Sequence, residues 1–195
     1  MKRVCVFCGS SMGNRPIYRN EAEILGRMLA ESDIGLVYGG AKLGLMGTIA
    51  DAVLAAGGEV IGVIPKHLLE KEVAHGGLTK LHVVPSMHER KALMAELADG
   101  FIALPGGFGT WEEMIEAVTW AQLALHGKPC VLLNTAGYYD PLLQMIEKGF
   151  QEGFLGELHR SLVLTATAAT DVISLMRSYE SPGSPELFAH WQEKI

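Results

Sequence analysis

The sequence has only three cysteines in 195 residues, which is too few for a disulfide framework. They lie in apolar, strand-like runs, as in proteins of a reducing compartment, so we expect a cytoplasmic protein. Cys5 and Cys8 form a Cys-x-x-Cys pair, but no second ligand cluster follows it. A strand also points residues three apart to opposite faces. Core packing is therefore preferred over a redox pair or a zinc half-site.

Long apolar runs, an excess of basic charge and paired metal-ligand spacing are missing too. No run approaches the roughly 20 apolar residues of a membrane helix, and Gly9 interrupts the apolar start too early for a signal peptide. The net charge is -6 and the pI is about 5.6, without a local basic patch for nucleic acid. The seven histidines show no metal-ligand pairing. We expect no membrane or nucleic-acid partner and no metal.

The residues that are present predict an α/β protein. Short β-branched runs alternate with segments of helical period, which is typical of a parallel sheet covered on both faces. We therefore predict a Rossmann-like, doubly wound parallel sheet in a single domain of residues 1–180, followed by a linker and a short C-terminal helix in 181–195. The expected strands are 3–8, 35–38, 60–64, 81–84, 101–104, 130–133 and 162–164, and the expected helices are 18–31, 46–56, 86–98, 110–125, 139–152 and 170–179.

Three of the predicted strands end in glycine-rich turns: Gly9-Ser10-Ser11, the segment from Gly39 to Gly47, and the segment from Pro105 to Thr110. Ligands of such sheets bind at these turns, where glycines allow close approach and a helix N-terminus attracts phosphate. Any one of these loops could also be an ordinary turn. NAD is disfavoured because no acidic residue ends the next strand, and a Walker A loop is excluded because no Gly-Lys-Ser/Thr follows the glycines.

The segment Pro105-Gly-Gly-Phe-Gly-Thr-Trp-Glu-Glu113 resembles the PGGxGTxxE signature of the Lonely Guy family, the cytokinin riboside 5′-monophosphate phosphoribohydrolases. Met87-His-Glu-Arg-Lys91, the turn from Gly39 to Gly47, and Thr119-Trp-Ala-Gln-Leu123 are similar to further landmarks of that family, in the same order. The resemblance extends from about Val4 to Phe154.

This resemblance implies a homodimeric enzyme without metal or redox cofactor that hydrolyses AMP or N6-modified AMP to free base and ribose 5-phosphate. It implies that Arg90 and Glu113 are the catalytic pair. The resemblance also implies a glutamate that contacts the substrate. Glu72 is assigned to this role, although a neighbouring glutamate could correspond to it instead. Together with the glycine turns, the resemblance indicates these substrate contacts: Gly9, Ser10, Gly39, Gly40, Glu72, Met87, Lys91, Gly106, Gly107, Phe108, Gly109, Thr110, Trp111, Glu112 and Thr119.

The chemistry of glycosidic cleavage fits these two residue types. Breaking the bond between ribose C1′ and purine N9 leaves positive charge on the sugar and negative charge on the base. Glu113 can stabilise the sugar cation and orient or deprotonate the attacking water. Arg90 does not readily release a proton, so we assign it to binding phosphate or purine and to keeping Glu113 ionised. No proton donor to the leaving base is assigned.

Structural explanations compete for the same residues. Thr110-x-x-Glu113 has the pattern of a helix capping box, and Arg90 could be a solvated helix residue. Glutamine also fills the last capping-box position, so we expect Glu113→Gln to melt near wild type while losing nearly all hydrolysis. Equal loss of folding and activity would favour the cap. The helical row Trp111, Met114, Ile115, Val118 and Leu123 is expected to be buried or to face a second subunit.

Two other functions compete with hydrolysis. The label lysine decarboxylase is attached to proteins with this glycine signature, but no Schiff-base lysine in a pyridoxal site is recognisable. The alternative from another class is a non-catalytic carrier of a nucleotide or of molybdenum cofactor, because glycine loops serve binding and catalysis alike. A carrier has no need of the pair Arg90 and Glu113. The preferred purine base cannot be read from the sequence.

Overall fold

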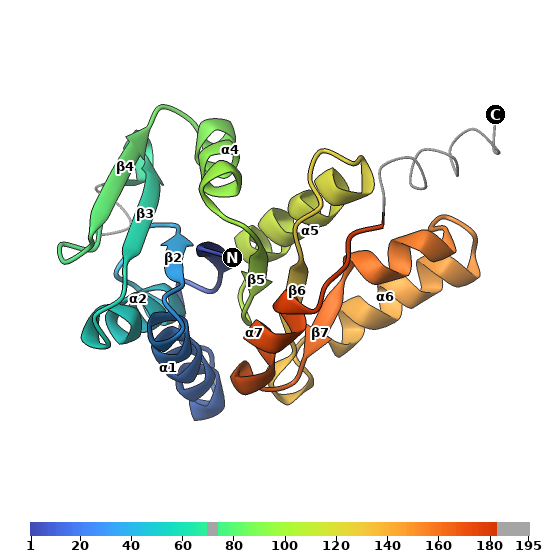
Figure 1. The fold of residues 1–195 in the computed structure, drawn as a ribbon, viewed down its shortest axis with the longest axis horizontal. Coiled ribbons are helices and arrows are strands. Elements are labelled where there is room, and N and C mark those ends of the chain that lie inside the picture. Colours follow the sequence, from blue (N-terminus) through green and yellow to red (C-terminus); the bar gives the residue numbers. More distant parts are fainter. Residues whose placement is uncertain (70–73, 183–195) are drawn as a thin grey trace.

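A seven-stranded parallel sheet forms the centre of the protein (Figure 1). The structure is a computed structural model that describes residues 1–69 and 74–182. The strands follow the spatial order β4-β3-β2-β1-β5-β6-β7, and every neighbouring pair is parallel. Their bounds are β1 Arg3–Phe7, β2 Gly35–Tyr38, β3 Val60–Pro65, β4 Lys80–Val84, β5 Phe101–Ala103, β6 Cys130–Leu133 and β7 Leu164–Ala166.

Helices cover both faces of this sheet. The α-helices are α1 Pro16–Glu31, α2 Gly44–Ala55, α3 Lys66–Leu69, α4 Met87–Leu97, α5 Phe108–Gln122, α6 Asp140–Gln151 and α7 Ala169–Arg177, with 3-10 helices η1 Thr135–Gly137 and η2 Glu157–Leu162. Residues of α1, α2 and α7 form one apolar core with Val4 and Val6 of β1. Residues of α4 and α5 form a second core with Cys5 and Phe7. The predicted doubly wound α/β fold is confirmed.

The alternation along β1 separates the Cys-x-x-Cys pair. Cys5 belongs to one core and Cys8 to the other, and both thiols are free and buried. Side chains three residues apart on a strand point to opposite faces, as the sequence predicted. The packing interpretation of this motif is confirmed.

The strand order reverses at β1. From it the chain builds outward through β2, β3 and β4 on one side, and through β5, β6 and β7 on the other. Such a reversal leaves a crevice beyond the carboxyl ends of the two central strands, because their connections leave toward opposite faces. The glycine turns after β1, β2 and β5 all open at this edge.

Several predicted boundaries are wrong by one to three residues. Leu162 ends η2 rather than beginning a strand, and the last strand runs from Leu164 to Ala166. The 3-10 helix forms because the N–H of Gly156 bonds to the His159 ring at 3.2 Å, a local contact that strand periodicity does not reveal. Helix α5 begins at Phe108 rather than Thr110 and ends at Gln122. The first strand ends at Phe7, one residue before Cys8.

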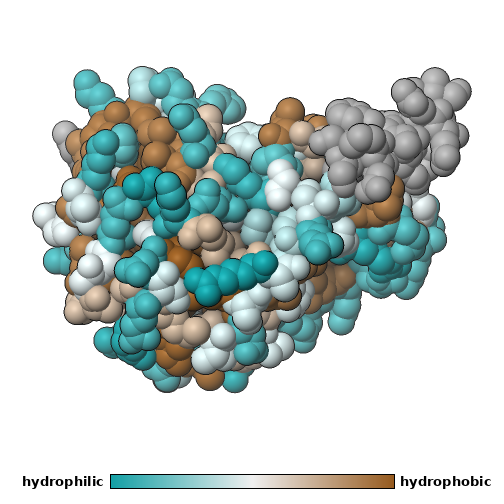
Figure 2. Space-filling view, in the orientation of Figure 1, coloured by the Kyte–Doolittle hydropathy of each residue, from teal (hydrophilic) through white to brown (hydrophobic). Residues whose placement is uncertain are grey.

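Two other predictions fall on segments outside the described residues. These are the short helix expected after residue 185 and the position of Glu72. Within the described ranges, no helix is long and apolar enough to cross a bilayer. Hydrophobic and hydrophilic residues are interspersed over the face drawn in Figure 2, with one hydrophobic group in the region of β3 and β4.

Candidate active site

A cavity of about 230 Å³ lies at the carboxyl edge of the sheet, where the strand order reverses. It is open to solvent, and the ends of β1 and β2, helix α4 and the start of α5 contribute to its wall. The lining residues are Val6, Phe7, Cys8, Gly9, Ser10, Gly39, Met46, Arg90, Met94, Gly107, Phe108, Gly109, Thr110 and Glu113. The three glycine turns thus meet at one cavity, as predicted.

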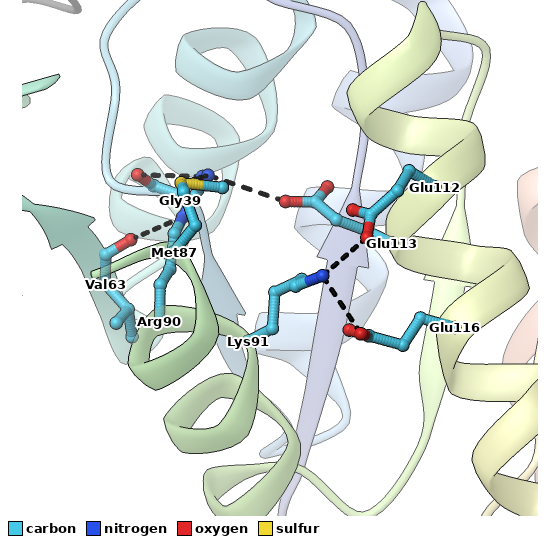
Figure 3. A network of polar contacts seen from close by, with 8 residues as sticks. All are labelled: Gly39, Val63, Met87, Arg90, Lys91, Glu112, Glu113 and Glu116. Carbon is cyan, nitrogen blue, oxygen red and sulfur yellow. Dashed lines mark hydrogen bonds and ion pairs between the residues drawn. The ribbon is translucent and has the colours of Figure 1, made fainter.

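Arg90 is the buried cation of this cavity, with only 6% of its surface exposed. It lies in the first turns of α4, whose N-terminus is capped by the Ser86 hydroxyl accepting from the N–H of Glu89 at 3.2 Å. Its Nε donates to the Val63 carbonyl at 3.1 Å, and its Nη2 donates to the Gly39 carbonyl at 3.4 Å (Figure 3). The alternative of a solvated surface arginine is therefore wrong.

Because Gly39 has no side chain, the guanidinium group of Arg90 can occupy the space beside it. A Cβ at this position would lie 2.1 Å from Arg90 Nη2 and 2.4 Å from the Met46 methyl group. No side chain can be accommodated there without displacing the arginine. The second glycine turn therefore serves the placement of Arg90 as well as the turn itself.

Glu113 faces Arg90 across the cavity from α5. The Glu113 carboxylate lies 3.5 Å from Arg90 Nη1, and its side chain is 11% exposed (Figure 3). The N-cap of α5 is Gly107, so Thr110 and Glu113 both lie inside the helix and do not form a capping box. The helix starts earlier than predicted because the chain is extended at Gly107 and helical from Phe108 onward. The capping interpretation of Glu113 is wrong.

Lys91 joins the same two helices beside the Arg90 and Glu113 pair. Its ammonium group bonds to the carboxylates of Glu112 and Glu116, at 2.5 and 3.0 Å (Figure 3). Partial burial lowers the pKa of Lys91, but the two carboxylate hydrogen bonds outweigh this effect and the pKa is raised overall. Lys91 is therefore a charged link between α4 and α5.

The predicted substrate contacts divide between the cavity and its surroundings. Gly106 borders an adjoining cavity of about 250 Å³ that shares Gly9, Ser10 and Gly107 with the first. The predicted contacts among the described residues that do not line the first cavity are Gly40, Met87, Lys91, Gly106, Trp111, Glu112 and Thr119.

The outlying contacts on α5 have partners of their own. Trp111 packs edge-on against Phe108 with ring centroids 5.3 Å apart, and the Thr119 hydroxyl donates to the Ile115 carbonyl at 2.7 Å. In the predicted helical row of α5, Met114 is buried in the core, whereas Trp111, Ile115 and Leu123 are exposed. Most of this row is therefore available to another surface.

Sequence reasoning missed five apolar lining residues, Val6, Phe7, Cys8, Met46 and Met94. Cys8 had one usable signal, because it directly precedes the first glycine turn. Burial raises the pKa of its thiol, and the nearby Glu113 carboxylate raises it further. Cys8 is therefore a neutral thiol in the cavity wall. Among residues 1–69 and 74–182, no three His, Cys, Asp or Glu side chains are grouped to hold a metal ion.

The arrangement suits an anionic ligand. The first N–H groups of an α-helix have no intrahelical acceptor, and its N-terminus carries partial positive charge. In α5 these groups belong to Phe108, Gly109 and Thr110, which all line the cavity together with Arg90. The Glu113 carboxylate adds an acceptor next to this positive region. The site can hold a phosphate and present a carboxylate to an adjacent carbon.

Sequence comparison relates the chain to known proteins. A family model described as possible lysine decarboxylase matches residues 46–176. The chain is 54% identical over 178 residues to the cytokinin riboside 5′-monophosphate phosphoribohydrolase of Rhodococcoides fascians, covering 91% of this chain and 90% of that protein. It is 48% identical over 178 residues to the enzyme of that name, LOG1, of Arabidopsis thaliana, covering 91% and 84%.

Solved structures share the fold. The Moco carrier protein of Chlamydomonas reinhardtii superposes with a TM-score of 0.68 at 21% identity, over 91% of this chain and 96% of that one. The molybdenum cofactor binding protein of Rippkaea orientalis gives the same TM-score at 22% identity, over 91% and 97%. At this identity the likeness concerns the fold alone.

Proposed function

This chain belongs to the family of cytokinin riboside 5′-monophosphate phosphoribohydrolases, and we propose that it hydrolyses the N-glycosidic bond of a purine nucleoside 5′-monophosphate. The products are the free base and ribose 5-phosphate. The observation that carries the proposal is the pair of buried Arg90 and partly buried Glu113, 3.5 Å apart in a cavity where the three glycine turns meet. The relatives of that name align with about nine-tenths of the chain.

The substrate phosphate binds at the N-terminus of α5 in this proposal. The N–H groups of Phe108, Gly109 and Thr110 belong to the first turn, and the N-cap residue, Gly107, has no side chain to cap them. Backbone amides and the helix dipole together stabilise a phosphate dianion at such a position. The sugar then extends from the phosphate toward the second turn of α5, which carries Glu113.

Glu113 acts on the anomeric carbon. As the bond between C1′ and N9 breaks, its electron pair leaves with the purine and the sugar becomes cationic. The Glu113 carboxylate stabilises this cation and takes the proton of the water whose oxygen bonds to C1′. Arg90 keeps Glu113 ionised, because a cation 3.5 Å away favours the charged carboxylate.

The remaining predicted contacts complete the substrate site. Trp111, Glu112 and Thr119 are exposed on α5, and Lys91 lies between α4 and α5; a base extending from the cavity would meet these residues. The exposed row Phe108, Trp111 and Ile115 supports a homodimer that covers this surface. The free, buried cysteines are consistent with a cytoplasmic location. Residues 1–180 form the enzyme domain in this proposal.

The test is incubation of the purified protein with AMP and with N6-isopentenyl-AMP, followed by chromatography. We expect release of the free base and of an equal amount of ribose 5-phosphate. Tight binding of AMP without release of adenine would support a carrier instead. As a control for the decarboxylase label, lysine with added pyridoxal phosphate should yield no carbon dioxide.

A further inference from the structure

Two adjacent tyrosines reach the glycine turn that precedes α5. The Tyr138 hydroxyl donates to the carbonyl of Gly106, and the Tyr139 hydroxyl donates to the carbonyl of Leu104 at 2.6 Å. Both tyrosines follow strand β6, so they lie more than 30 residues from their acceptors in the sequence. Neither belongs to the motifs by which the site was predicted.

The backbone before these tyrosines is tightly specified. Ala136 and Gly137 have φ angles of 55° and 75°, and the left-handed region is unfavourable for an alanine. The Asn134 side chain holds the following turn, because its oxygen accepts from the N–H of Tyr139 at 2.6 Å and its amide donates to Asp140 at 2.7 Å. A strained, side-chain-locked turn therefore presents the two phenol groups to the loop.

The loop that receives them is held at three consecutive carbonyls. Tyr139 holds Leu104, the N–H of Gly9 donates to Pro105 at 3.1 Å, and Tyr138 holds Gly106. A Cβ on Gly106 would lie 2.1 Å from the Thr110 hydroxyl oxygen, so this peptide also packs against the first turn of α5. The direction of the Gly106 peptide and the start of α5 are thus coupled.

The two tyrosines differ in what they control. Tyr139 is 2% exposed, belongs to the apolar core, and contacts the loop before Pro105. Tyr138 is half-buried, borders the cavity adjoining the catalytic one, and contacts the last peptide before the helix. Because a peptide unit is planar and trans, fixing the Gly106 carbonyl also fixes the N–H of Gly107, which then points away from Tyr138. Gly107 lines both cavities.

We propose that Tyr138 is a positioning residue for phosphate binding, acting through the Gly106 peptide on the N-terminus of α5. This inference rests on the proposed function, which places the substrate phosphate at that helix end. Tyr139 has the matched chemistry, a phenol bonded to a carbonyl of the same loop, but serves the stability of the core.

The experiment compares Tyr138→Phe with Tyr139→Phe, since each variant loses only a hydroxyl group. Dissociation constants for AMP and ribose 5-phosphate are measured by calorimetry, the KM and kcat for AMP by chromatography, and the melting temperature by scanning calorimetry. For Tyr138→Phe we expect both dissociation constants and the KM to rise about tenfold, as for loss of one hydrogen bond, with kcat within about threefold and Tm within about 2 °C. For Tyr139→Phe we expect a lower Tm with dissociation constants within about twofold of wild type.

Two results would overturn the assignment: unchanged ribose 5-phosphate binding in Tyr138→Phe, or equal weakening in both variants. The wild-type protein separates this inference from the proposed function. If it binds AMP without releasing adenine, the hydrolase proposal fails while the comparison of dissociation constants still decides the role of Tyr138. Absence of binding to the wild-type protein overturns both.

Discussion

Arg90 receives its acceptors from three distant parts of the chain. The Gly39 carbonyl directly follows β2, the Val63 carbonyl belongs to β3, and the Glu113 carboxylate belongs to α5. A buried guanidinium requires such partners, because desolvating an unpaired charge costs several kcal/mol. The two carbonyls hold the arginine in place. Among residues 1–69 and 74–182, Glu113 is the only acidic residue that forms an ion pair with it. The pairing proposed to support catalysis is thus also a structural requirement of Arg90.

Replacement of Glu113 separates these two roles. In Glu113→Gln the amide oxygen still accepts from Arg90, and the two carbonyl bonds remain, so we expect Tm to fall by no more than about 4 °C. The charge proposed to stabilise the sugar cation is lost, and we expect hydrolysis to fall by about 10³-fold.

Calorimetry and the adenine-release assay measure these two quantities. Glu96→Gln is the control, since Glu96 is an exposed glutamate of α4 away from the cavity, and it should retain both stability and activity. An active Glu113→Gln enzyme would exclude Glu113 as the catalytic carboxylate.

At the scale of elements, the two helices that carry the proposed catalytic pair begin differently. Helix α4 starts with a side-chain cap from Ser86, whereas Gly107 at the start of α5 offers none. A side-chain cap satisfies N–H groups that a ligand would otherwise bind. The uncapped start of α5 therefore suits the proposed phosphate site, and the capped start of α4 suits a helix that only positions Arg90.

Alanine substitutions in the turn before α5 test how closely it is packed. A Cβ on Gly106 would lie 2.1 Å from the Thr110 hydroxyl and 2.8 Å from the backbone nitrogen of Gly9, whereas one on Gly109 has no neighbour within 4 Å. We expect Gly106→Ala to lose about 1 to 3 kcal/mol of unfolding free energy. Gly109→Ala should gain up to about 1 kcal/mol, because alanine favours the helix.

Urea unfolding of the two variants gives both free energies. Gly109 also lines the cavity, so we expect its variant to show a raised KM for AMP despite its stability. Equal stability of the two alanine variants would contradict the close packing described for Gly106.

On the scale of the whole molecule, the reversal of strand order at β1 decides where a ligand can bind. It brings together turns from residues 9, 39 and 107, which are far apart in the sequence. The same topology leaves an apolar row on α5 facing outward, with Phe108 85% and Ile115 41% exposed. Large apolar side chains grouped on one helix face indicate a protein interface.

The proposed homodimer predicts that a charge at this row dissociates the protein. We expect light scattering to give twice the 21.1 kDa chain mass for the wild type, and close to the chain mass for Ile115→Glu. Ile17→Glu is the matched control, since Ile17 is 39% exposed on α1, on the other face of the sheet, and should leave the dimer intact. Dissociation by both variants, or by neither, would place the interface elsewhere.

Periodicity and turn residues sufficed to predict the strands, the parallel sheet and the three ligand-facing turns. These signals are local, because alternation along β1 or the glycines after it reflect the conformation of a few neighbouring residues. They failed where local patterns are ambiguous. The Thr110 and Glu113 spacing fits a capping box equally well, and only the position of Gly107 in the tertiary structure shows that the helix has already begun.

Motif resemblance singled out Arg90 and Glu113, but pairing, burial and support depend on contacts between segments remote in the sequence. No local pattern relates Val63 to Arg90, or Tyr138 to Gly106. These contacts form because the sheet aligns the carboxyl ends of its strands and the helices return to cover them. The amino-acid sequence by itself therefore determines which residue types are present at the turns. The pairing of Arg90 with Glu113 and the orientation of the turn before α5 arise only when the strands assemble.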